Sequence, residues 1–506
     1  MMKIGLVYIK GAVPGFENFG NLPTHLLKKN GLVEGLNAHK ILDGIIIPGG
    51  TIVESESLSP ELSEEIKIMA RQGKFILGIC SGFQALAIKT DIGRKSPCKI
   101  EKKGLGLLDV SFSPMISNDR VEAHVTGGSF LTKGLVGETI NGFHCHTYGH
   151  IEGNSETIFK SNIKRVNYAD DHRDVVAGVK NSEGNVVGTM IHGCLDNNPS
   201  LVENILKFTD ASEEDRTQII SDNLNLVKKI RRNLGIETGI RVTDNINSKK
   251  GINHASDELP PTIMIGSTGS DSGKTFLMTG LAGAFRRKGI KVAVLKIGPD
   301  IRDIVPALYL TKEKMETHSS IKIGNLGWMD LKDVLKSLKS FNYDLVIIEG
   351  VMSIFTGILN EKVPYSSAEI ARAANIPVLM VSSCNKGGIE TAAVNLASHV
   401  RIMRKFGINV PGVILNRVYN LEIFHRACQI FKNDNNLEMI GKVPKVKMNK
   451  RGNTPEVEIK LEDFCYMALK TVENHLELEK IIKMAKVPDF KGYMDMGSIE
   501  ESFYFK

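Results

Sequence analysis

The sequence lacks the features that would place it in a membrane or outside the cell. No apolar run approaches the roughly 20 residues that span a bilayer, and the amino terminus has no secretory-signal pattern. Only seven cysteines occur in 506 residues, none in a CxxC pair, so neither a disulfide framework nor a structural zinc site is expected. These absences predict a cytoplasmic protein without membrane association.

An excess of one charge is also lacking. The formal charge is +7, and the lysines are spread along the chain rather than gathered in one tract. No motif supports nucleic-acid binding, and none is predicted. The 42% hydrophobic and 24% charged shares are typical of a globular protein. Because 506 residues exceed one ordinary hydrophobic core, two or three domains are expected.

Short apolar runs alternate with longer amphipathic stretches in both halves, which is typical of α/β domains with parallel sheets. The runs that we expect to form buried strands are 4–8, 45–48, 75–79, 263–265, 292–295, 345–348, 378–381 and 413–415. The fold class predicted is therefore α/β, with two doubly wound parallel-sheet domains.

A seam separates the two halves. A charged helical stretch at about 212–234 leads into the polar segment 243–258, which Pro260 and Pro261 close. Helices at 461–485 are expected to cover the second domain. The predicted organisation is a first domain at 1–207, a helical connector and linker at 208–260, and a second domain at 261–506.

The run from Gly78 to Gly82 carries a candidate nucleophile. A buried strand ends in Gly-Ile-Cys-Ser-Gly, and a helix follows. Two flanking glycines permit the sharp strand-to-helix turn that presents a nucleophile at the carboxyl end of a sheet. A helix amino terminus behind Cys80 is expected to lower the pKa of its thiol. The alternative for Cys80 alone is a small buried core cysteine.

Two further features favour catalysis. Gly49 and Gly50 follow another strand, and their backbone N–H groups, with that of Ser81, are candidates for an oxyanion hole. His192 ends a later strand and is the candidate base for Cys80. The ordered set resembles class I glutamine amidotransferases over about residues 1–205, and this resemblance implies a glutaminase domain that takes L-glutamine as ammonia donor.

Within that class, the first half resembles the glutaminase domain of cobyric acid synthase. The supporting stretches are Gly78–Leu86, Gly104–Leu108, Gly142–His146 and Gly193–Asn197. Most class I glutaminases place a glutamate two residues after the histidine, where this chain has Cys194, and the cobyric acid branch lacks that acid too. The residue that orients His192 is therefore not identified. His144, Cys145, His146 and His150 could form a metal cluster or an ordinary loop and strand, and we favour the loop and strand because no complementary ligand pair is present.

The second half opens with a phosphate-binding loop. A strand at 263–265 runs into Gly266–Thr275, and a helix follows. Small residues let backbone N–H groups wrap a phosphate at a helix terminus, a lysine offsets its charge, and a hydroxyl can hold Mg²⁺. The residues expected to bind ATP are Ser270, Asp271, Ser272, Gly273, Lys274, Thr275 and Phe276. The alternative is a merely flexible loop.

This loop and three later stretches resemble dethiobiotin synthetase and the cobyrinate and cobyric acid synthases over about 261–487. The stretches are Lys296–Asp300 with Asp303, Tyr343–Met352 and Val413–Val418. The resemblance implies an ATP-dependent synthetase with Lys296 as a catalytic cation, Asn416 and Arg417 at the nucleotide, Mg²⁺ on Thr275, Glu349 and Asp300, and substrate at Asp303. For Glu349 or Asp300 alone, the alternative is a solvated carboxylate at a loop end.

The resemblance implies that ATP activates a carboxylate as an acyl phosphate, which ammonia from Cys80 converts to an amide. The expected acceptor is a small-molecule carboxylate on a corrinoid or related tetrapyrrole, and a homodimer is left open. This sequence departs from the family at Arg302, Ile304 and Thr356, and the order of its domains is reversed. The alternatives are therefore another carboxylic acid as acceptor, a partitioning or carrier ATPase with a vestigial glutaminase, and a scaffold without catalysis.

Overall fold

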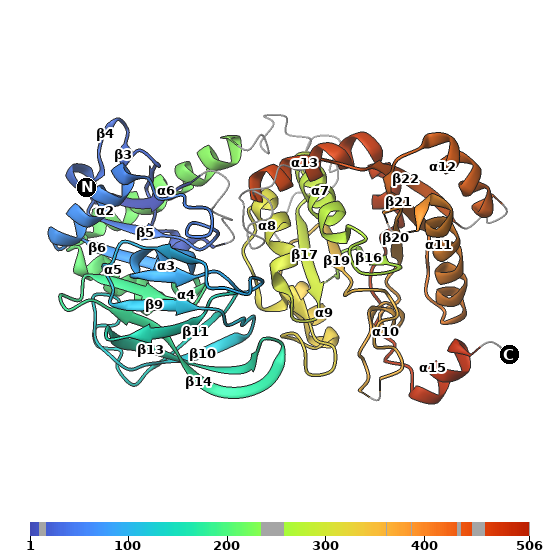
Figure 1. The fold of residues 1–506 in the computed structure, drawn as a ribbon, viewed down its shortest axis with the longest axis horizontal. Helices are drawn as coiled ribbons and strands as arrows, with labels where there is room; N and C mark the ends of the chain where they lie inside the picture. The colour runs from blue at the N-terminus through green and yellow to red at the C-terminus, as the bar shows by residue number, and fades with distance from the viewer. Residues whose placement is uncertain are drawn as a thin grey trace. The chain divides into compact units, whose positions relative to one another are not determined.

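The computed structural model describes residues 1–9, 17–233, 258–360, 362–385, 387–432, 437–447 and 461–504. The chain forms two compact units, and each is treated by itself (Figure 1). Unit 1 comprises Met1–Gly235 with Asn449–Asp463, and unit 2 comprises Ile236–Met448 with Phe464–Lys506. The polar segment predicted at 243–258 lies outside the described residues except for Glu258, so the predicted domain limits stay predictions.

Unit 1 is built on a nine-stranded sheet with five parallel strands at one side. From edge to edge the strands are β11 (Thr139–Phe143), β10 (Arg120–Val125), β13 (Glu156–Val166), β14 (Ala169–Lys180), β15 (Val186–Thr189), β6 (Phe75–Ile79), β5 (Gly44–Ile47), β1 (Ile4–Val7) and β2 (His25–Leu27). Neighbours from β15 to β2 pair in parallel, whereas those from β11 to β15 pair antiparallel. The antiparallel part was not predicted.

Smaller elements surround this sheet. A second sheet has the order β12 (His150–Gly153), β9 (Val110–Ser113), β7 (Lys89–Asp91) and β8 (Glu101–Lys103), and a short hairpin joins β3 (Leu32–Val33) to β4 (Leu36–Asn37). The helices are η1 (Phe19–Asn21), α1 (Ala38–Ile41), α2 (Pro60–Arg71), α3 (Ser81–Leu86), α4 (Cys194–Asn197), α5 (Pro199–Phe208) and α6 (Glu213–Asn233).

A buried ion pair fixes the antiparallel part of unit 1. Asp119 precedes β10, and its Oδ1 accepts hydrogen bonds from Nη2 and Nε of Arg165 in β13, at 2.6 and 3.1 Å. Its Oδ2 accepts from the backbone N–H groups of Lys164 and Arg165, at 2.9 and 3.0 Å. Both side chains of the ion pair are buried. The carboxylate therefore satisfies four donors, three of them on the buried Arg165.

Asp119→Ala is expected to lower the free energy of unfolding of unit 1 by about 3–5 kcal/mol, because it removes one partner of a buried, hydrogen-bonded ion pair. Hydrogen–deuterium exchange of β13 amides across a urea series measures this loss. The matched control is Asp174→Ala on exposed β14, which is expected to change stability by no more than about 0.5 kcal/mol. A loss below about 1 kcal/mol for Asp119→Ala would contradict the argument.

Unit 2 is a seven-stranded sheet in which every pair of neighbours is parallel. Its order is β18 (Ser320–Ile321), β17 (Val292–Ile297), β19 (Leu345–Glu349), β16 (Thr262–Ser267), β20 (Val378–Ser383), β21 (Gly412–Val418) and β22 (Glu438–Pro444). The described helices are α7 (Lys274–Arg287), η3 (Ile301–Ile304), α8 (Val305–Thr311), η4 (Thr317–Ser319), α9 (Leu331–Leu338), α10 (Ser367–Ala373), α11 (Gly388–Lys405), α12 (Leu421–Ala427), η5 (Cys428–Phe431), α13 (Leu461–His475), α14 (Leu478–Met484) and α15 (Met496–Phe503).

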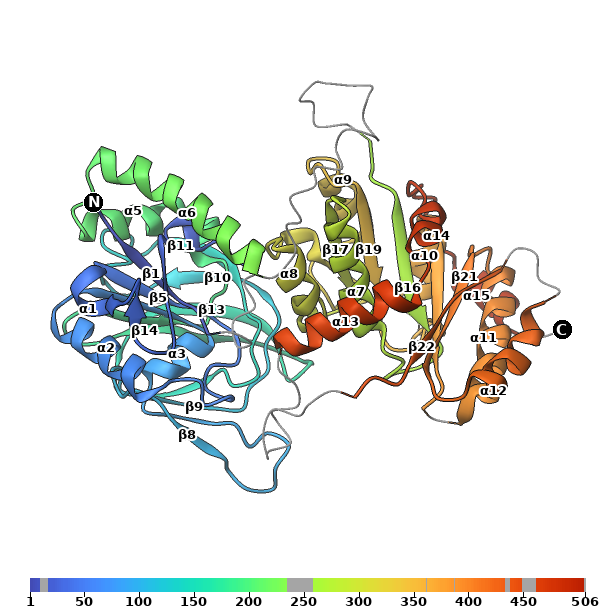
Figure 2. The same ribbon diagram turned by 90° about the horizontal axis from the view of Figure 1, so that it is seen from above.

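The stretch 461–485 forms the helices α13 and α14, in agreement with the predicted helices. Helix α13 lies along α7 (Figure 2), and a Cβ added at Gly280 would come 2.4 Å from the carbonyl oxygen of Ala468. Glycine at this position therefore allows the two helices to approach closely. The eight predicted strands correspond to β1, β5, β6, β16, β17, β19, β20 and β21. The predicted α/β class with parallel sheets is confirmed.

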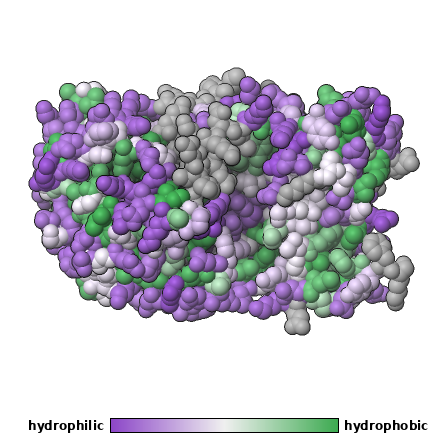
Figure 3. Space-filling view, in the orientation of Figure 1, coloured by the Kyte–Doolittle hydropathy of each residue, from purple (hydrophilic) through white to green (hydrophobic). Residues whose placement is uncertain are grey.

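Three observations concern membrane-spanning helices, the molecular surface and disulfide bonds. Among the described residues, no helix is long and apolar enough to cross a membrane. Figure 3 shows hydrophilic and hydrophobic side chains interspersed over the face that it presents. All seven cysteines lie in the described part of the chain, and none of them forms a disulfide bond.

Candidate functional site

Three neighbouring parallel strands of unit 1 bring the predicted glutaminase residues to one edge of the sheet. Strand β6 lies between β5 and β15. Gly49 and Gly50 follow β5, Cys80 follows β6, and His192 follows β15. The backbone N–H of Cys80 donates to the carbonyl oxygen of Thr189, the last residue of β15, at 2.8 Å. The motifs, distant in sequence, therefore meet at the carboxyl ends of adjacent strands.

Cys80 occupies a strained turn between β6 and α3. Its φ of 51° and ψ of −108° are rarely adopted by residues other than glycine. A Cβ added at Gly82 would lie 2.0 Å from the carbonyl oxygen of Ile47, and one added at Gly78 would lie 2.7 Å from that of Gly82. Both flanking glycines are therefore required by close backbone approach, as predicted for a nucleophile elbow.

His192 lies directly against the glycine turn that follows β5. A Cβ added at Gly49 would come 2.5 Å from Cε1 of the His192 ring. Phe143 stacks on the other side, with ring centroids 5.4 Å apart. The Ser81 hydroxyl accepts a hydrogen bond from the backbone N–H of Ile52 at 2.9 Å, which ties the elbow to the same turn. The arrangement holds a histidine, a thiol and the predicted oxyanion donors together.

A carboxylate that was not predicted from the sequence contacts this histidine. Oε1 of Glu17 lies 2.5 Å from His192 Nδ1, and Oε2 accepts from the backbone N–H of Gly193 at 2.7 Å. Both side chains are buried. Glu17 precedes His192 by 175 positions, so no local spacing links the two residues. The sequence alone therefore offers no signal for this contact.

The expectation that the elbow favours a thiolate at Cys80 is wrong for the structure described. Burial raises the pKa of the Cys80 thiol well above its usual value, and Cys145, Glu54 and Glu17 raise it further. The backbone N–H of Ser81 opposes this rise, but its effect is smaller. Because α3 is only six residues long, its terminus does not outweigh burial. The thiol is therefore neutral until a base removes its proton.

Cys80 is accordingly expected to react slowly with iodoacetamide at neutral pH, at least about tenfold more slowly than Cys98, because only a thiolate attacks rapidly. Cys80 is 6% exposed, whereas Cys98 lies at the surface of the same unit. Peptide mass spectrometry after timed alkylation of the folded protein compares the two. Equal or faster labelling of Cys80 would contradict this account of its pKa.

The histidines near the elbow form no metal cluster. His144 and His146 are both buried, with ring centroids 4.8 Å apart, and His150 lies on the surface beside Glu152. Burial, with His146 and His192 nearby, lowers the pKa of His144 well below its usual value. Across the described ranges, no group of three or more His, Cys, Asp and Glu residues is arranged to hold a metal ion.

In unit 2 the phosphate loop connects β16 to α7. Gly273 has a φ of 86°, and a Cβ added there would lie 2.2 Å from Nδ2 of Asn416. That amide donates to the carbonyl oxygen of Ser272 at 2.8 Å. Asn416 from β21 therefore braces the loop from the side. Ser270 and Asp271, at the tip of the loop, are exposed.

Two lysines converge beside this loop. Nζ of Lys274 donates to the Met352 carbonyl oxygen at 2.7 Å and to the Ser267 hydroxyl at 2.9 Å. Burial lowers the pKa of Lys274 to about 8, although Glu349 opposes the shift. Nζ of Lys296 lies 2.6 Å from Asp303 and 3.3 Å from Glu349. Burial disfavours its charge, but these two carboxylates raise its pKa above the usual value.

Part of the predicted magnesium site fits a cation. The Thr275 hydroxyl donates to Oε1 of Glu349 at 2.7 Å. Within the described part of the chain, Oε2 of Glu349 is buried without a hydrogen-bond partner, which leaves an acceptor where a cation would be stabilised. Asp300 instead pairs with Arg302, its Oδ1 3.0 Å from Nε. Thr275 and Glu349 therefore suit Mg²⁺ without rearrangement, whereas Asp300 would first have to exchange its partner.

The remaining predicted nucleotide residues differ in accessibility. The Phe276 side chain is buried against Phe464, with ring centroids 5.5 Å apart, so only its backbone is available to a nucleotide. Arg417 is partly exposed and has a φ of 62°, and Ser272 is buried. The Ser272 hydroxyl donates to the Gly269 carbonyl oxygen at 2.7 Å. Ser272 therefore shapes the loop through its side chain.

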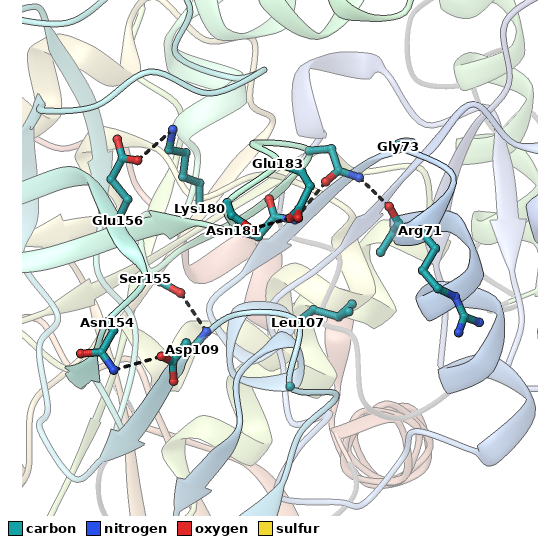
Figure 4. Close-up of a pocket in the computed structure, with 14 residues that line it drawn as sticks. Arg71, Gly73, Leu107, Asp109, Asn154, Ser155, Glu156, Lys180, Asn181 and Glu183 are labelled. Carbon is teal, nitrogen blue, oxygen red and sulfur yellow. Dashed lines mark hydrogen bonds and ion pairs between the residues drawn. The ribbon is translucent and has the colours of Figure 1, made fainter.

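Pockets also occur away from these residues. One of about 760 Å³ in unit 1 includes Gly73, which precedes β6, whereas Cys80 follows that strand. Glu156 and Lys180 both line it and point toward each other (Figure 4), with Nζ 3.0 Å from the carboxylate. A pocket of about 550 Å³ in unit 2 includes Pro411, which precedes β21. Both lie at the amino ends of strands, opposite the predicted sites.

Known proteins match both units. Residues 11–200 match the CobB/CobQ-like glutamine amidotransferase domain, and residues 263–454 match the CobQ/CobB/MinD/ParA nucleotide binding domain. The two segments match these domain families in this order along the chain. The predicted resemblance to cobyrinate and cobyric acid synthases, with the glutaminase domain first, is confirmed.

Curated relatives include cobyrinate a,c-diamide synthases. That of Caldanaerobacter subterraneus subsp. tengcongensis is 30% identical over 234 residues, 45% of this chain and 50% of the relative. Those of Dehalococcoides mccartyi (strain CBDB1) and Methanococcus maripaludis (strain C5) are each 28% identical, over 45% and 48% of this chain and 49% and 54% of the relatives. The chain thus spans about half the length of the curated relatives it matches.

Solved structures show weaker likeness. PurLQS from Thermotoga maritima is 21% identical, with a TM-score of 0.31 over 41% of this chain and 99% of that one. The cell division protein FtsY from Thermotoga maritima is 18% identical, with a TM-score of 0.27 over 53% of this chain and 86% of that one. Both scores are low, so neither protein adds to the description of the two sites.

Proposed function

We propose that this chain is a carbon–nitrogen ligase that hydrolyses glutamine and ATP to amidate carboxylates of a corrinoid or related tetrapyrrole. The observation that carries the proposal is the meeting of Cys80 and His192 at adjacent strand ends of a glutamine amidotransferase domain. A nucleotide binding domain in the same chain supplies the partner activity. Neither activity alone explains the presence of both domains.

The first half-reaction releases ammonia. His192 takes the proton of the neutral Cys80 thiol as the sulfur attacks the side-chain amide of glutamine. Backbone N–H groups of Gly49, Gly50 and Ser81 stabilise the negative oxygen of the tetrahedral intermediate. The proton then passes to the departing nitrogen, which leaves as ammonia, and water hydrolyses the thioester to glutamate. Burial suits the nucleophile, because a neutral thiol avoids wasteful reaction before glutamine arrives.

The second half-reaction activates the acceptor. A carboxylate oxygen attacks the terminal phosphorus of ATP, giving an acyl phosphate and ADP, and ammonia displaces phosphate to leave an amide. Lys274 and Lys296 offset the charge of the phosphoryl group in transfer, while Asp303 holds Lys296 and faces the substrate. Mg²⁺ held by Thr275 and Glu349 would supply further positive charge to the phosphates. Asn416 and Arg417 lie beside the nucleotide, and Asp300 is proposed as an additional metal ligand.

The proposed acceptor follows from the relatives. The relatives are named for cobyrinate. A different carboxylic acid is the second candidate, because the family stretch Gly-Leu-[Tyr/Phe]-Asp-Gly reads Ser353-Ile354-Phe355-Thr356-Gly357 here. The aspartate is missing, and the side chain of Thr356, which lies in a turn closed by its backbone N–H to the carbonyl oxygen of Ser353 at 3.0 Å, carries no charge. The loss of this charge favours a change in what the site accepts.

The proposal is tested by incubating purified protein with Mg²⁺-ATP, glutamine and a panel of tetrapyrrole carboxylic acids. Mass spectrometry follows the conversion of carboxyl to amide, together with glutamate and ADP. An amidated tetrapyrrole establishes the reaction and the number of carboxylates converted. Glutamate and ADP without such a product would move the acceptor to another acid, and ADP release that ignores glutamine would replace the proposal by a carrier or partitioning ATPase.

A further inference from the structure

Glu17 reaches His192 from a strained turn near the amino terminus. The three residues of η1, Phe19, Gly20 and Asn21, all have positive φ, at 52°, 63° and 58°. For Phe19 and Asn21 this conformation costs free energy, which the surrounding contacts must offset. A Cβ added at Gly20 would lie 2.5 Å from Cγ2 of Val202. The turn therefore packs closely against the part of the chain that follows His192.

A second carboxylate holds this turn. Asp196 in α4 accepts hydrogen bonds from the backbone N–H groups of Asn18 and Gly20, each at 2.8 Å, through its two different oxygens. Asp196 follows His192 by four residues. The two segments are therefore joined reciprocally, since Glu17 bonds to the histidine and to Gly193, and Asp196 bonds back to the residues beside Glu17. Each of the two carboxylates uses both of its oxygens.

The geometry points to a two-carboxylate support for the catalytic base, in which Glu17 orients His192 and Asp196 holds Glu17 in place. This inference rests on the proposed glutaminase reaction. The Glu17 carboxylate accepts from Nδ1–H, which selects the tautomer whose Nε2 can take the Cys80 proton, and it stabilises the imidazolium that results. Glu17 and Asp196 are both positioning residues. Together they supply the orienting group that Cys194 does not provide at the position usual in class I glutaminases.

Glu17→Gln tests the first residue at constant size. The site requires two acceptors, for Nδ1–H and for the Gly193 N–H, but an amide has only one. If its oxygen faces Gly193, its NH₂ group faces Nδ1 and selects the tautomer that cannot take a proton at Nε2. The kcat for glutamine hydrolysis is therefore expected to fall about 10²–10⁴-fold, with little change in KM. Asp196→Asn loses one of two acceptors for the turn, and a smaller fall of about tenfold is expected.

The experiment measures kcat and KM for glutamate release by the full-length protein, with ammonia-dependent ATP turnover and Tm as parallel readouts. The matched control is Glu64→Gln, which removes a surface carboxylate paired with Arg71 in the same unit. Expected is a loss in kcat with Tm and ammonia-dependent turnover unchanged. If the wild-type protein hydrolyses glutamine and the kcat of Glu17→Gln lies within twofold of the wild-type kcat, this inference alone is overturned.

The other outcomes are also decisive. If Glu17→Gln lowers Tm, the kcat of Asp196→Asn decides whether the inference holds, because that variant leaves Glu17 in the chain. A kcat loss at the wild-type Tm supports the two-carboxylate arrangement, and an unchanged kcat overturns it. Absence of glutamate release by the wild-type protein would overturn the proposed function, and this inference with it.

Discussion

Cys80→Ala is expected to abolish glutamine-dependent amidation while leaving amidation from ammonium salts intact. The variant removes the only atom proposed to attack glutamine, so glutamate release should fall by roughly three orders of magnitude or more. Cys80 is in the elbow of unit 1, whereas the phosphate loop is built entirely from unit 2. ATP turnover with ammonia should therefore continue. Glutamate release, ADP release and amide formation are measured in parallel with each nitrogen source.

The matched control is Cys98→Ala, which removes an exposed thiol from the same unit and is expected to leave both activities unchanged. Equal loss of glutamine-dependent and ammonia-dependent turnover in Cys80→Ala, at an unchanged Tm, would reject the division of labour between the two domains. Retained glutamate release would reject Cys80 as the nucleophile.

Lys274→Ala is expected to have the opposite effect. Its Nζ lies at the start of α7 in the phosphate loop, held by the Met352 carbonyl and the Ser267 hydroxyl. Removing this charge should lower ATP-dependent amidation on the order of a thousandfold, because phosphoryl transfer depends chiefly on positioning and on offsetting negative charge. Basal glutamate release should remain. ADP formation with saturating acceptor and ammonia measures the loss.

Lys288→Ala provides the comparison for this variant. Lys288 lies at the far end of the same helix, where it pairs with Glu479 at the surface. It is expected to turn over ATP as the wild type does. Undiminished ATP-dependent product formation by Lys274→Ala would rule out its proposed role at the phosphates.

The parts of the sites that sequence analysis could predict are those whose determinants are local. The Cys80 elbow and the phosphate loop each consist of a strand, a glycine-containing turn and a helix in uninterrupted succession. Hydrophobic runs predicted the parallel strands because a buried strand is also a local feature of the sequence. The alternation in β10, with every second residue buried, was present in the sequence and was overlooked.

Contacts between distant segments could not be found in this way. The hydrogen bond between Glu17 and His192 depends on how the whole of unit 1 places β15 and the η1 turn. No sequence motif beside either residue indicates that the other lies nearby. The neutral Cys80 thiol has a similar cause, because burial is a property of the assembled core rather than of the elbow motif. Pairing of Asp300 with Arg302 involves near neighbours, but the sequence alone does not decide whether Asp300 faces a metal or this arginine.

The hydrogen bond between Cys80 and Thr189 has a consequence for how this domain can diverge. After α3 the chain forms the second sheet and the strands β10, β11, β13 and β14 of the nine-stranded sheet, and it then returns as β15 directly beside β6. The relative position of the nucleophile and its base is thus set by the register of one strand pair, whatever the length of the chain segment between the two strands. Insertions and deletions within β7–β14 can remodel the surroundings of the thiol while the reacting pair keeps its register. The segment from β7 to β14 is therefore where the domain can acquire new partners while its reacting pair is retained.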